Sequence, residues 1–456
     1  MSRVVVSVHG IRTRGVWQKE IAAVLSTSGI VPEAHDFGRF GLLRLILPSC
    51  RRQEVDKFAT FYDSIMRNGQ YGLHPDYPAR RPSVVAHSFG TFIVGHCLAK
   101  YDHIKLDKIV LCGSILPLDF NWWQLIARDQ VTSIMNDRAL KDTPVRLARF
   151  VARDTGPSGR VGFHYFGSML DERPGTELRH SDFFGRERME RQWLPFLTRA
   201  SSRYRIEHSR DLGIEERDRL LEQGHGLDSQ RYSDVPHYQE VEIPRGLAAR
   251  WCAINEDIYC FLVDRETRRL DGYLNAMPLR REAAGRVLSG ELRDNLVSDE
   301  DVATYADAHA ANDLYIMSLC VRMDAQHAHK GLYSEPVERL LNALIDKLAY
   351  HARRSRFVVR RIISVAWTAA GRKLCDMFRM RRVGHDRYGN DIYVTRIADC
   401  LEVSTHSGLH HLACLYKDMG LLDGAGTHDE HEASPRPLKP LKAGIVRDRT
   451  RRRSGG

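Results

Sequence analysis

Ser88 stands where an apolar pattern typical of a strand changes to one typical of a helix. Residues 83–91 read SVVAHSFGT, so Ser88 directly follows a strand pattern and directly precedes a helical one. A tight turn between such elements exposes a hydroxyl above the edge of a sheet, and the N-terminus of the helix favours negative charge beside it. Ser88 is therefore a candidate nucleophile for attack on an acyl carbonyl. The plain alternative is a serine that only caps the helix.

The residues around this serine form the pattern small-x-Ser-x-Gly over 86–90. The pattern resembles the nucleophile elbow of the α/β-hydrolase family, with Ala86 in place of the first glycine. Residues 8–12, VHGIR, resemble the family's His-Gly oxyanion loop at the end of the first strand. The resemblance implies a serine hydrolase that acts on an ester, thioester or amide. It also implies an oxyanion hole formed by the backbone N–H groups of Ile11 and Phe89, each contributing about 3 kcal/mol.

A histidine must take the proton of such a nucleophile and return it to the leaving group. In the α/β-hydrolase family the order along the chain is serine, acid, histidine. His180, within ELRHSD, lies just before the last helical pattern of the first half, so we expect it to be this base. His164, within the apolar run GFHYF, is the alternative.

An acid must accept the Nδ1–H of that histidine and stabilise the imidazolium. The resemblance places it after a late strand, and three aspartates follow strand patterns. Asp142, followed by a turn that contains Pro144, fits best, while Asp137 and Asp119 stay open. Each of the three could instead be a surface charge or a helix cap.

The elements that must position these residues alternate along the first 200 positions. Short apolar strands separated by helices are typical of a mainly parallel sheet with helices on both faces. The carboxyl ends of parallel strands meet at one edge, where the serine, the acid and the histidine can converge. The expected strands are 4–8, 31–37, 83–87, 107–113 and 130–135, and the expected helices are 15–26, 53–67, 89–101 and 182–200.

A tryptophan-bearing run, PLDFNWWQLIA, occupies residues 117–127. It follows a strand at the same edge of the expected sheet. Its apolar side chains suit a lid over an apolar substrate and suit a core helix equally well, so both interpretations stay open.

In the second half the pattern changes to a mixed order of strands and helices. Residues 257–279 predict an antiparallel hairpin, and a strand at 314–321 is followed by a long amphipathic helix at 334–352. The order of elements over 203–397 resembles the GNAT N-acetyltransferase superfamily. The match is strongest at 368–380, where that family has a helix leading into a turn. The resemblance implies a mixed α/β domain that binds acetyl-CoA and transfers its acetyl group.

The GNAT superfamily holds a pyrophosphate on backbone N–H groups where its long helix begins. The corresponding residues 328–334 read AHKGLYS; Gly331 matches the central glycine, and Tyr333 replaces a small residue. The family's tyrosine acid falls on Cys375, a poorer proton donor. A non-catalytic acyl-CoA sensor or a partner-binding module is therefore the alternative. The residues that the resemblance assigns to the cofactor are Cys320, Val321, Lys330, Gly331, Leu332 and Ser334.

The charge, the hydropathy and the cysteine content limit which other classes of function the sequence allows. The chain carries 68 basic and 58 acidic residues, and part of the excess lies in residues 421–456, which we expect to be a disordered tail. No nucleic-acid-binding motif accompanies this tail. No apolar run approaches the roughly 20 residues that span a bilayer. The nine cysteines are scattered through apolar runs, which favours free thiols and a cytoplasmic protein.

Four potential metal ligands, His406, His410, His411 and Cys414, lie close together in the sequence. They lack CxxC or HExxH spacing, so we expect no metal site.

The sequence thus predicts an α/β-hydrolase domain at 1–200, a GNAT-like mixed α/β domain at 203–420 and a tail. The expected partner is a small-molecule or acylated substrate. The rival hypothesis is a regulatory protein in which both folds serve recognition without catalysis.

Overall fold

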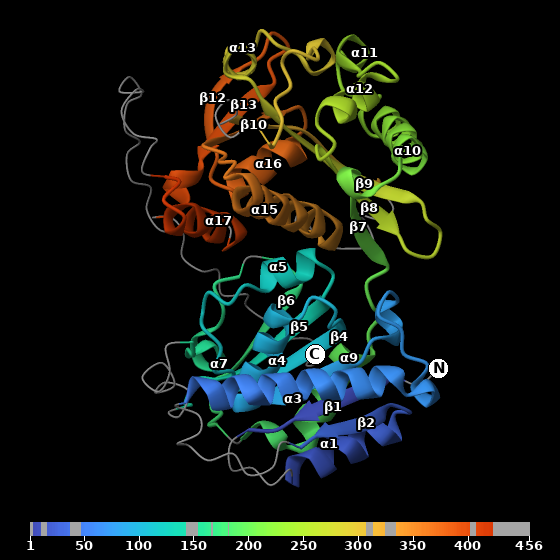
Figure 1. Ribbon diagram of the computed structural model, residues 1–456, viewed down its shortest axis with the longest axis vertical. Coiled ribbons are helices and arrows are strands. Elements are labelled where there is room, and N and C mark those ends of the chain that lie inside the picture. Colours follow the sequence, from blue (N-terminus) through green and yellow to red (C-terminus); the bar gives the residue numbers. More distant parts are fainter. Residues whose placement is uncertain are drawn as a thin grey trace, which may run out of the picture.

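Two separate sheets organise the chain, and each is built from the short apolar runs of the sequence (Figure 1). The computed structural model describes residues 3–10, 16–36, 47–142, 154–165, 167–180, 182–306, 313–323, 334–401 and 407–422. The predictions for Ile11, Lys330, Gly331, Leu332 and Tyr333, and for residues 423–456 of the tail, lie outside the described residues.

The first sheet has six strands, all parallel, in the order β2-β1-β3-β4-β5-β6. β1, β3 and β4 are buried along their whole length, as expected for strands that are covered on both faces. The prediction of a parallel sheet with intervening helices is confirmed. The strands are β1 (Val4–Val8), β2 (Val31–His35), β3 (Ser83–His87), β4 (Leu106–Cys112), β5 (Val131–Ala139) and β6 (Leu170–Gly175).

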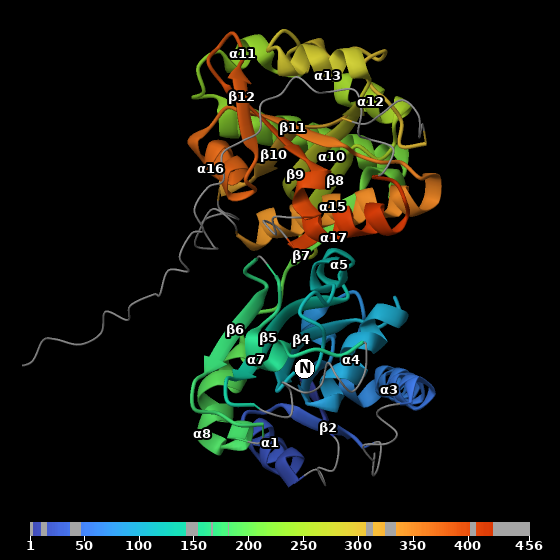
Figure 2. The same ribbon diagram turned by 90° about the vertical axis from the view of Figure 1, so that its left-hand side faces the viewer.

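Helices cover both faces of this sheet, with α3 and α4 on one side and α1 and α8 on the other (Figure 2). Successive side chains of a strand point to opposite faces, so Val84 enters the core under α4 and Val85 enters the core under α1. The helices are α1 (Val16–Thr27), α3 (Pro48–Arg67), α4 (Phe89–Lys100), α5 (Trp122–Ala127), α7 (Ser158–Val161), α8 (Arg186–Arg188) and α9 (Leu194–Thr198).

The strand order reverses beside β1, because β2 lies on one side of it and β3 on the other. At such a switch point the connections leave in opposite directions and a crevice opens beyond the carboxyl ends of the strands. β1 ends at Val8 and β3 ends at His87. His9, Gly10 and Ser88 therefore stand at this crevice.

The helix expected over 182–200 is broken once, at Gly185, and is helical from residue 186 to residue 198. A 3-10 turn at Asp182–Phe184, helix α8, a π-helical turn at Met189–Trp193 and helix α9 follow one another. Arg188, Met189, Trp193 and Leu194 keep right-handed helical dihedrals, so α8, the π-helical turn and α9 continue without a break.

The second sheet has seven strands in the order β12-β13-β11-β10-β9-β8-β7. β10 and β11 run parallel, and the other neighbouring pairs run antiparallel. This mixed sheet agrees with the expectation for the second half. Its strands are β7 (Tyr204–His208), β8 (Tyr259–Asp264), β9 (Leu270–Leu279), β10 (Asp313–Val321), β11 (Arg361–Ala366), β12 (Arg381–His385) and β13 (Asp391–Arg396).

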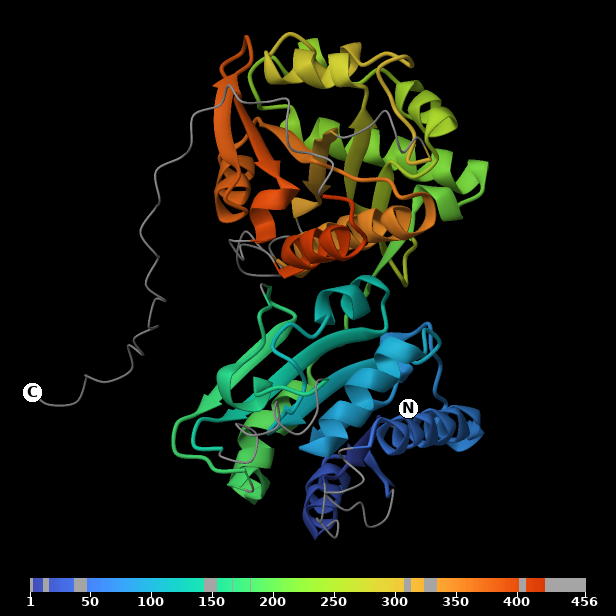
Figure 3. The ribbon, with the colours of Figure 1, turned by 60° about the vertical axis from the view of Figure 1, so that its left-hand side comes forward.

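Helices also cover both faces of the second sheet. The core on one face contains α15 and α17, and the core on the other contains α10, α12 and α13. In Figure 3 the orange and red helices α15 and α17 lie between the two sheets. The helices are α10 (Ile214–Tyr232), α11 (Tyr238–Val241), α12 (Leu247–Ile254), α13 (Arg281–Leu288), α15 (Glu335–Ser355), α16 (Ala369–Met377) and α17 (Ser407–Asp418).

Helix α5 joins the two halves by packing against α15. Trp122 is buried in the core of the first half, whereas the adjacent Trp123 belongs to the core of the second half. The Gln124 side chain donates to the Asp346 carboxylate at 2.8 Å. Residues 117–127 therefore form a core and interface segment, and the lid interpretation is wrong.

A buried carboxylate makes a second contact between the halves. Glu338 of α15 is fully buried and accepts hydrogen bonds from the Tyr165 hydroxyl and from the backbone N–H (2.6 Å) and hydroxyl (2.9 Å) of Ser168. A buried carboxylate is tolerated only with such a set of donors. These bonds hold the first turn of α15 against the residues that precede β6.

Among the described helices, none combines the length and apolar character that crossing a bilayer requires. All nine cysteines lie among the described residues, where none forms a disulfide and seven are buried. Free thiols agree with the expectation from their scattered spacing.

Candidate active site

Ser88 occupies the turn between β3 and α4 in a conformation that L-residues rarely adopt. Its φ is 52° and its ψ is −119°. Such strain persists only where the surrounding structure imposes it, and it concentrates at functional sites. Ser88 is the first residue before α4, yet its side chain makes no capping hydrogen bond. The capping interpretation of Ser88 therefore lacks its defining contact.

Two glycines allow the chain to approach itself closely at this turn. A Cβ on Gly90 would lie within 2.8 Å of the His9 carbonyl oxygen and closer still to the carbonyl of Val8. A Cβ on Gly10 would lie 2.8 Å from the Cβ of Ser88. The start of α4 is thus pressed against the end of β1, which explains the small residues of the sequence motif.

Ser88, His180 and Asp142 lie in a single hydrogen-bonded row. The Nε2 of His180 is 3.1 Å from the Ser88 Oγ, and its Nδ1 is 2.7 Å from the Asp142 carboxylate. Asp142 is fully buried, whereas the His180 side chain is 21% exposed, so the row is open to solvent only at its serine end. With Nδ1–H donated to Asp142, Nε2 carries the lone pair that accepts the Ser88 hydroxyl.

A third glycine, Gly113, makes room for this row. It follows β4 directly and has a φ of 54°. A Cβ there would lie 3.2 Å from the His180 Nδ1 and 3.3 Å from an Asp142 carboxylate oxygen. A larger residue would therefore push on the histidine and the acid together.

The alternative acids and the alternative base lie elsewhere. Asp137 is fully buried, but it accepts hydrogen bonds from the Arg188 guanidinium and from the Trp193 indole at 2.9 Å. It therefore anchors the broken helix to β5. Asp119 and His164 are exposed, and both lie near His411 of α17 in the second half.

His87 contributes to the site although the sequence motif gave it no role. It is 1% exposed, and burial lowers its pKa to about 3, so the ring is neutral. Its Nε2–H donates to the backbone carbonyl of His180 at 3.0 Å, and the two rings lie 4.8 Å apart. His180 is thus fixed through its backbone as well as through its ring.

Two backbone N–H groups are expected to form the oxyanion hole, and one of them, that of Phe89, lies among the described residues. Phe89 is fully buried and is the first residue of the twelve-residue helix α4. Its N–H therefore belongs to the positive end of the helix dipole beside Ser88. The other expected donor, Ile11, lies outside the described residues.

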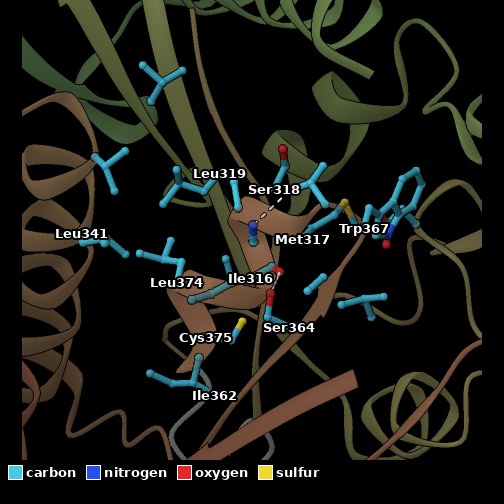
Figure 4. Close-up of a pocket in the computed structure, with 18 of the residues that line it drawn as sticks. Ile316, Met317, Ser318, Leu319, Leu341, Ile362, Ser364, Trp367, Leu374 and Cys375 are labelled. Atoms are coloured by element: carbon cyan, nitrogen blue, oxygen red, sulfur yellow. Dashed lines mark hydrogen bonds between the residues drawn. The ribbon is translucent and has the colours of Figure 1, made fainter. Parts of the chain in front are cut away.

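Of the residues expected to bind acetyl-CoA, Cys320 and Val321 lie at the end of β10, and Ser334 lies directly before α15. Val321 lines a cavity of about 200 Å³ at this end of β10, and Cys320 is buried beside it. Cys375 also lines this cavity (Figure 4), and burial raises the pKa of its thiol to about 12. Lys330, Gly331 and Leu332 lie outside the described residues, so acetyl-CoA binding stays a prediction.

The first turn of α15 does not fit a pyrophosphate. A phosphate at a helix N-terminus needs free N–H groups and positive potential. Here Ser334 precedes Glu335, Pro336 and Glu338, so the turn carries two carboxylates and one residue without an N–H. Burial raises the pKa of Glu338, whose carboxyl is already engaged with the first half of the chain.

No group of three or more metal-ligating side chains occurs among the described residues. His410 and Cys414 do meet, with 3.6 Å between Nε2 and Sγ, but the other His410 ring nitrogen bonds to the carbonyl of Cys400 at 2.9 Å.

Comparison with known proteins gives structural neighbours only. No family model and no curated protein matches this sequence. The C-terminal condensation domain of Ebony, in complex with beta-alanyl-dopamine, has a TM-score of 0.28 and 12% identity over 42% of this chain and 98% of that chain. A cold-adapted esterase from an Arctic intertidal metagenomic library has a TM-score of 0.26 and 18% identity over 40% of this chain and 75% of the esterase.

A GNAT-family acetyltransferase from Bacillus anthracis has a TM-score of 0.24 and 12% identity over 43% of this chain and 94% of that enzyme. These TM-scores are low. The fold class therefore rests on the two sheets described above.

Proposed function

We propose that the N-terminal half is a serine hydrolase that cleaves an ester, thioester or amide through an acyl-Ser88 intermediate. The observation that carries the proposal is the position of His180, whose two ring nitrogens lie 3.1 Å from the Ser88 Oγ and 2.7 Å from the Asp142 carboxylate. A nucleophile, a base and a group that orients the base are the three parts this chemistry needs.

Acylation begins when the His180 Nε2 takes the proton from the Ser88 hydroxyl. The oxygen attacks the substrate carbonyl carbon, and the carbonyl electron pair moves onto its oxygen. The Phe89 N–H, and by resemblance that of Ile11, stabilise this oxyanion. Asp142 stabilises the imidazolium, which then protonates the leaving oxygen, sulfur or nitrogen as its bond to the carbonyl carbon breaks.

Deacylation repeats the sequence with water as the nucleophile. His180 takes a proton from the water, the hydroxide attacks the acyl carbon, and the proton returns to the Ser88 oxygen as the carboxylic acid leaves. The half-exposed position of Ser88 at the crevice gives water access to the acyl group.

A fluorophosphonate probe tests the activated serine directly. We expect the wild-type chain to be labelled at Ser88 and to hydrolyse small nitrophenyl esters, and the Ser88→Ala variant to lose both properties. Ser64→Ala is the matched control, because this exposed α3 hydroxyl bonds only to its own helix. An unlabelled wild-type chain would favour the regulatory hypothesis, and full esterase activity in Ser88→Ala would exclude Ser88 as the nucleophile.

Acetyl transfer by the C-terminal half stays a prediction, because the described residues at the start of α15 do not fit a pyrophosphate. Calorimetry of the full chain with coenzyme A at millimolar concentration tests it. Measurable heat of binding would support acetyl-CoA binding by the C-terminal half, with residues before α15 as its phosphate contacts.

A further inference from the structure

Hydrogen bonds to its own main chain hold Ser88 in its rare backbone conformation. Its N–H donates to the Cys112 carbonyl at 3.0 Å, which continues the pairing of β3 with β4. Its carbonyl accepts two bonds from one residue, Thr91: one from the backbone N–H at 2.9 Å and one from the side-chain hydroxyl at 2.6 Å. A strained residue keeps its conformation only where its surroundings impose it. Thr91 therefore holds the carbonyl of the nucleophile through its backbone and through its side chain.

The hydroxyl of Thr91 also reaches a second segment of the chain. Thr91 is fully buried in the first turn of α4, and its hydroxyl accepts the N–H of Ile115 at 3.1 Å. A threonine in a helix often bonds to a carbonyl of the preceding turn, and that contact alone is local. The bond from Ile115 is not local, because Ile115 stands two residues after Gly113, which leaves room for the base and the acid of the row. One hydroxyl thus joins the carbonyl of the nucleophile to the segment beside its partners.

His87 connects the other side of Ser88 to the segment that carries the base. The aromatic rings of Trp17 and Phe184 lie against its buried ring, with centroids 6.4 and 4.9 Å away. This packing fixes the direction in which the Nε2–H points, which is toward the His180 carbonyl at 3.0 Å. Since His87 directly precedes Ser88 in the chain, the bond fixes the main chain of the base relative to that of the nucleophile.

We propose that Thr91 and His87 are positioning residues for the serine nucleophile and its base. Neither side chain exchanges a proton with the substrate. Thr91 keeps the turn in the conformation that presents the nucleophilic hydroxyl, and His87 keeps the base within hydrogen-bond reach of it. The proposal rests on the hydrolase function proposed above and adds the two side chains that maintain its geometry. A misplacement of about 1 Å can cost about 10²-fold in rate, so the loss of either contact should slow the chemistry without weakening substrate binding.

Thr91→Val tests the first contact, because it exchanges the hydroxyl for a methyl group of similar size. In the full-length chain we expect the rate of fluorophosphonate labelling at Ser88 and the kcat for a nitrophenyl ester to fall at least tenfold, with KM within twofold of the wild type. Thr91→Ser keeps the hydroxyl and should restore most of the rate. Thr27→Val is the matched control and should keep the wild-type rate, because the Thr27 hydroxyl bonds only to the carbonyl three residues earlier, at 2.8 Å, within the described residues.

His87→Leu tests the second contact, because leucine fills much of the same space without an N–H. The labelling rate and kcat should again fall at least tenfold at an unchanged KM. His87→Gln should recover most of this loss, since its side-chain amide can donate to the same carbonyl. His208→Leu is the matched control, because burial lowers the pKa of both histidines to about 3 and His208 lies in the second half. This control should keep the wild-type labelling rate.

Near-ultraviolet circular dichroism and the thermal midpoint establish that each variant is folded before its rates are compared. Thr91→Ala and His87→Asn remove the same bonds with smaller side chains and replace any variant that does not fold. Wild-type labelling rates in the folded Thr91 and His87 variants would assign these residues to stability alone and overturn the proposal. An equal loss of rate in the two controls would overturn it as well.

Failure of the proposed function gives a different result from failure of the positioning roles. An unlabelled wild-type chain would reject Ser88 as an activated nucleophile. A labelled wild-type chain, together with unchanged rates in Thr91→Val and His87→Leu, would reject the positioning roles alone.

Discussion

The edge of the first sheet and the interior of the second place their polar atoms in opposite ways. At the first, Ser88, His180 and Asp142 bond to one another, so each reactive atom has its partner before any substrate arrives. At the second, the Asp228 Oδ1 is shielded and has no donor among the described residues. The first arrangement leaves one hydroxyl accessible beside a base, whereas the second keeps a carboxylate oxygen away from solvent at a cost in desolvation.

The two regions also differ in whether the backbone or the side chains define them. At the first, the positive φ of Ser88 and the close contacts of Gly10, Gly90 and Gly113 fix the site through main-chain geometry. The cavity of the second sheet is bounded mainly by side chains, so substitutions there should change its shape before they change the fold.

The largest effect should come from removing the charge that orients the base. Asp142→Asn leaves the shape of the site but favours the wrong tautomer of His180, and kcat for ester hydrolysis should fall by about 10⁴-fold. Asp137→Asn should instead keep kcat and lower the free energy of unfolding by about 3 kcal/mol, because it weakens a buried pair with Arg188. The opposite result, lost activity in Asp137→Asn alone, would exchange the roles of the two acids.

A smaller effect should follow from adding one methyl group beside the row. Gly113→Ala places a Cβ against His180 and Asp142, and a displacement of the base should lower kcat by about 10²-fold. Gly72→Ala is the control, because Gly72 has a similar φ of 60° but no atom within 4 Å of the added Cβ. Equal kcat in the two variants would separate Gly113 from catalysis.

Buried histidines in both halves should make the folded chain sensitive to acid. Burial lowers the pKa of His35 to about 4 and that of His87 to about 3 in the first half, and that of His208 to about 3 in the second. These histidines are neutral in the folded chain and take up protons when the chain unfolds. Their contribution to the free energy of unfolding therefore falls as the pH drops below 6.5. Each of these histidines should lower the free energy of unfolding by about 2 kcal/mol at pH 5 relative to pH 7.

Urea unfolding at pH 7 and pH 5 measures this loss. His103→Asn, at an exposed histidine of the first half, should leave the pH dependence unchanged. His208→Asn should reduce this pH dependence by about 2 kcal/mol, and an unchanged pH dependence in that variant would contradict the neutral state of the buried ring.

Sequence patterns predicted the strands that are buried on both faces, since these appear as unbroken apolar runs. They missed β6 and β12, whose sequences LDERPG and RRVGH are polar because both are edge strands with one neighbour. Helix α13 was also missed, within the polar stretch that follows β9.

At the site, the motif and the chain order predicted which serine and histidine meet. The choice among three aspartates depended on Arg188 and Trp193, which lie about fifty positions after Asp137 and which no local pattern connects to it. The role of His87 was hidden for a similar reason, because its partner is a backbone carbonyl 93 residues away.

The division of two adjacent tryptophans between two interiors has a consequence for separating the halves. Trp122 and Trp123 both belong to α5, so the first half expressed alone would expose Trp123, and the second half expressed alone would lack that core side chain. A genetic exchange that replaced one half would have to replace the α5 surface as well. The second half therefore depends on the first for part of its own interior.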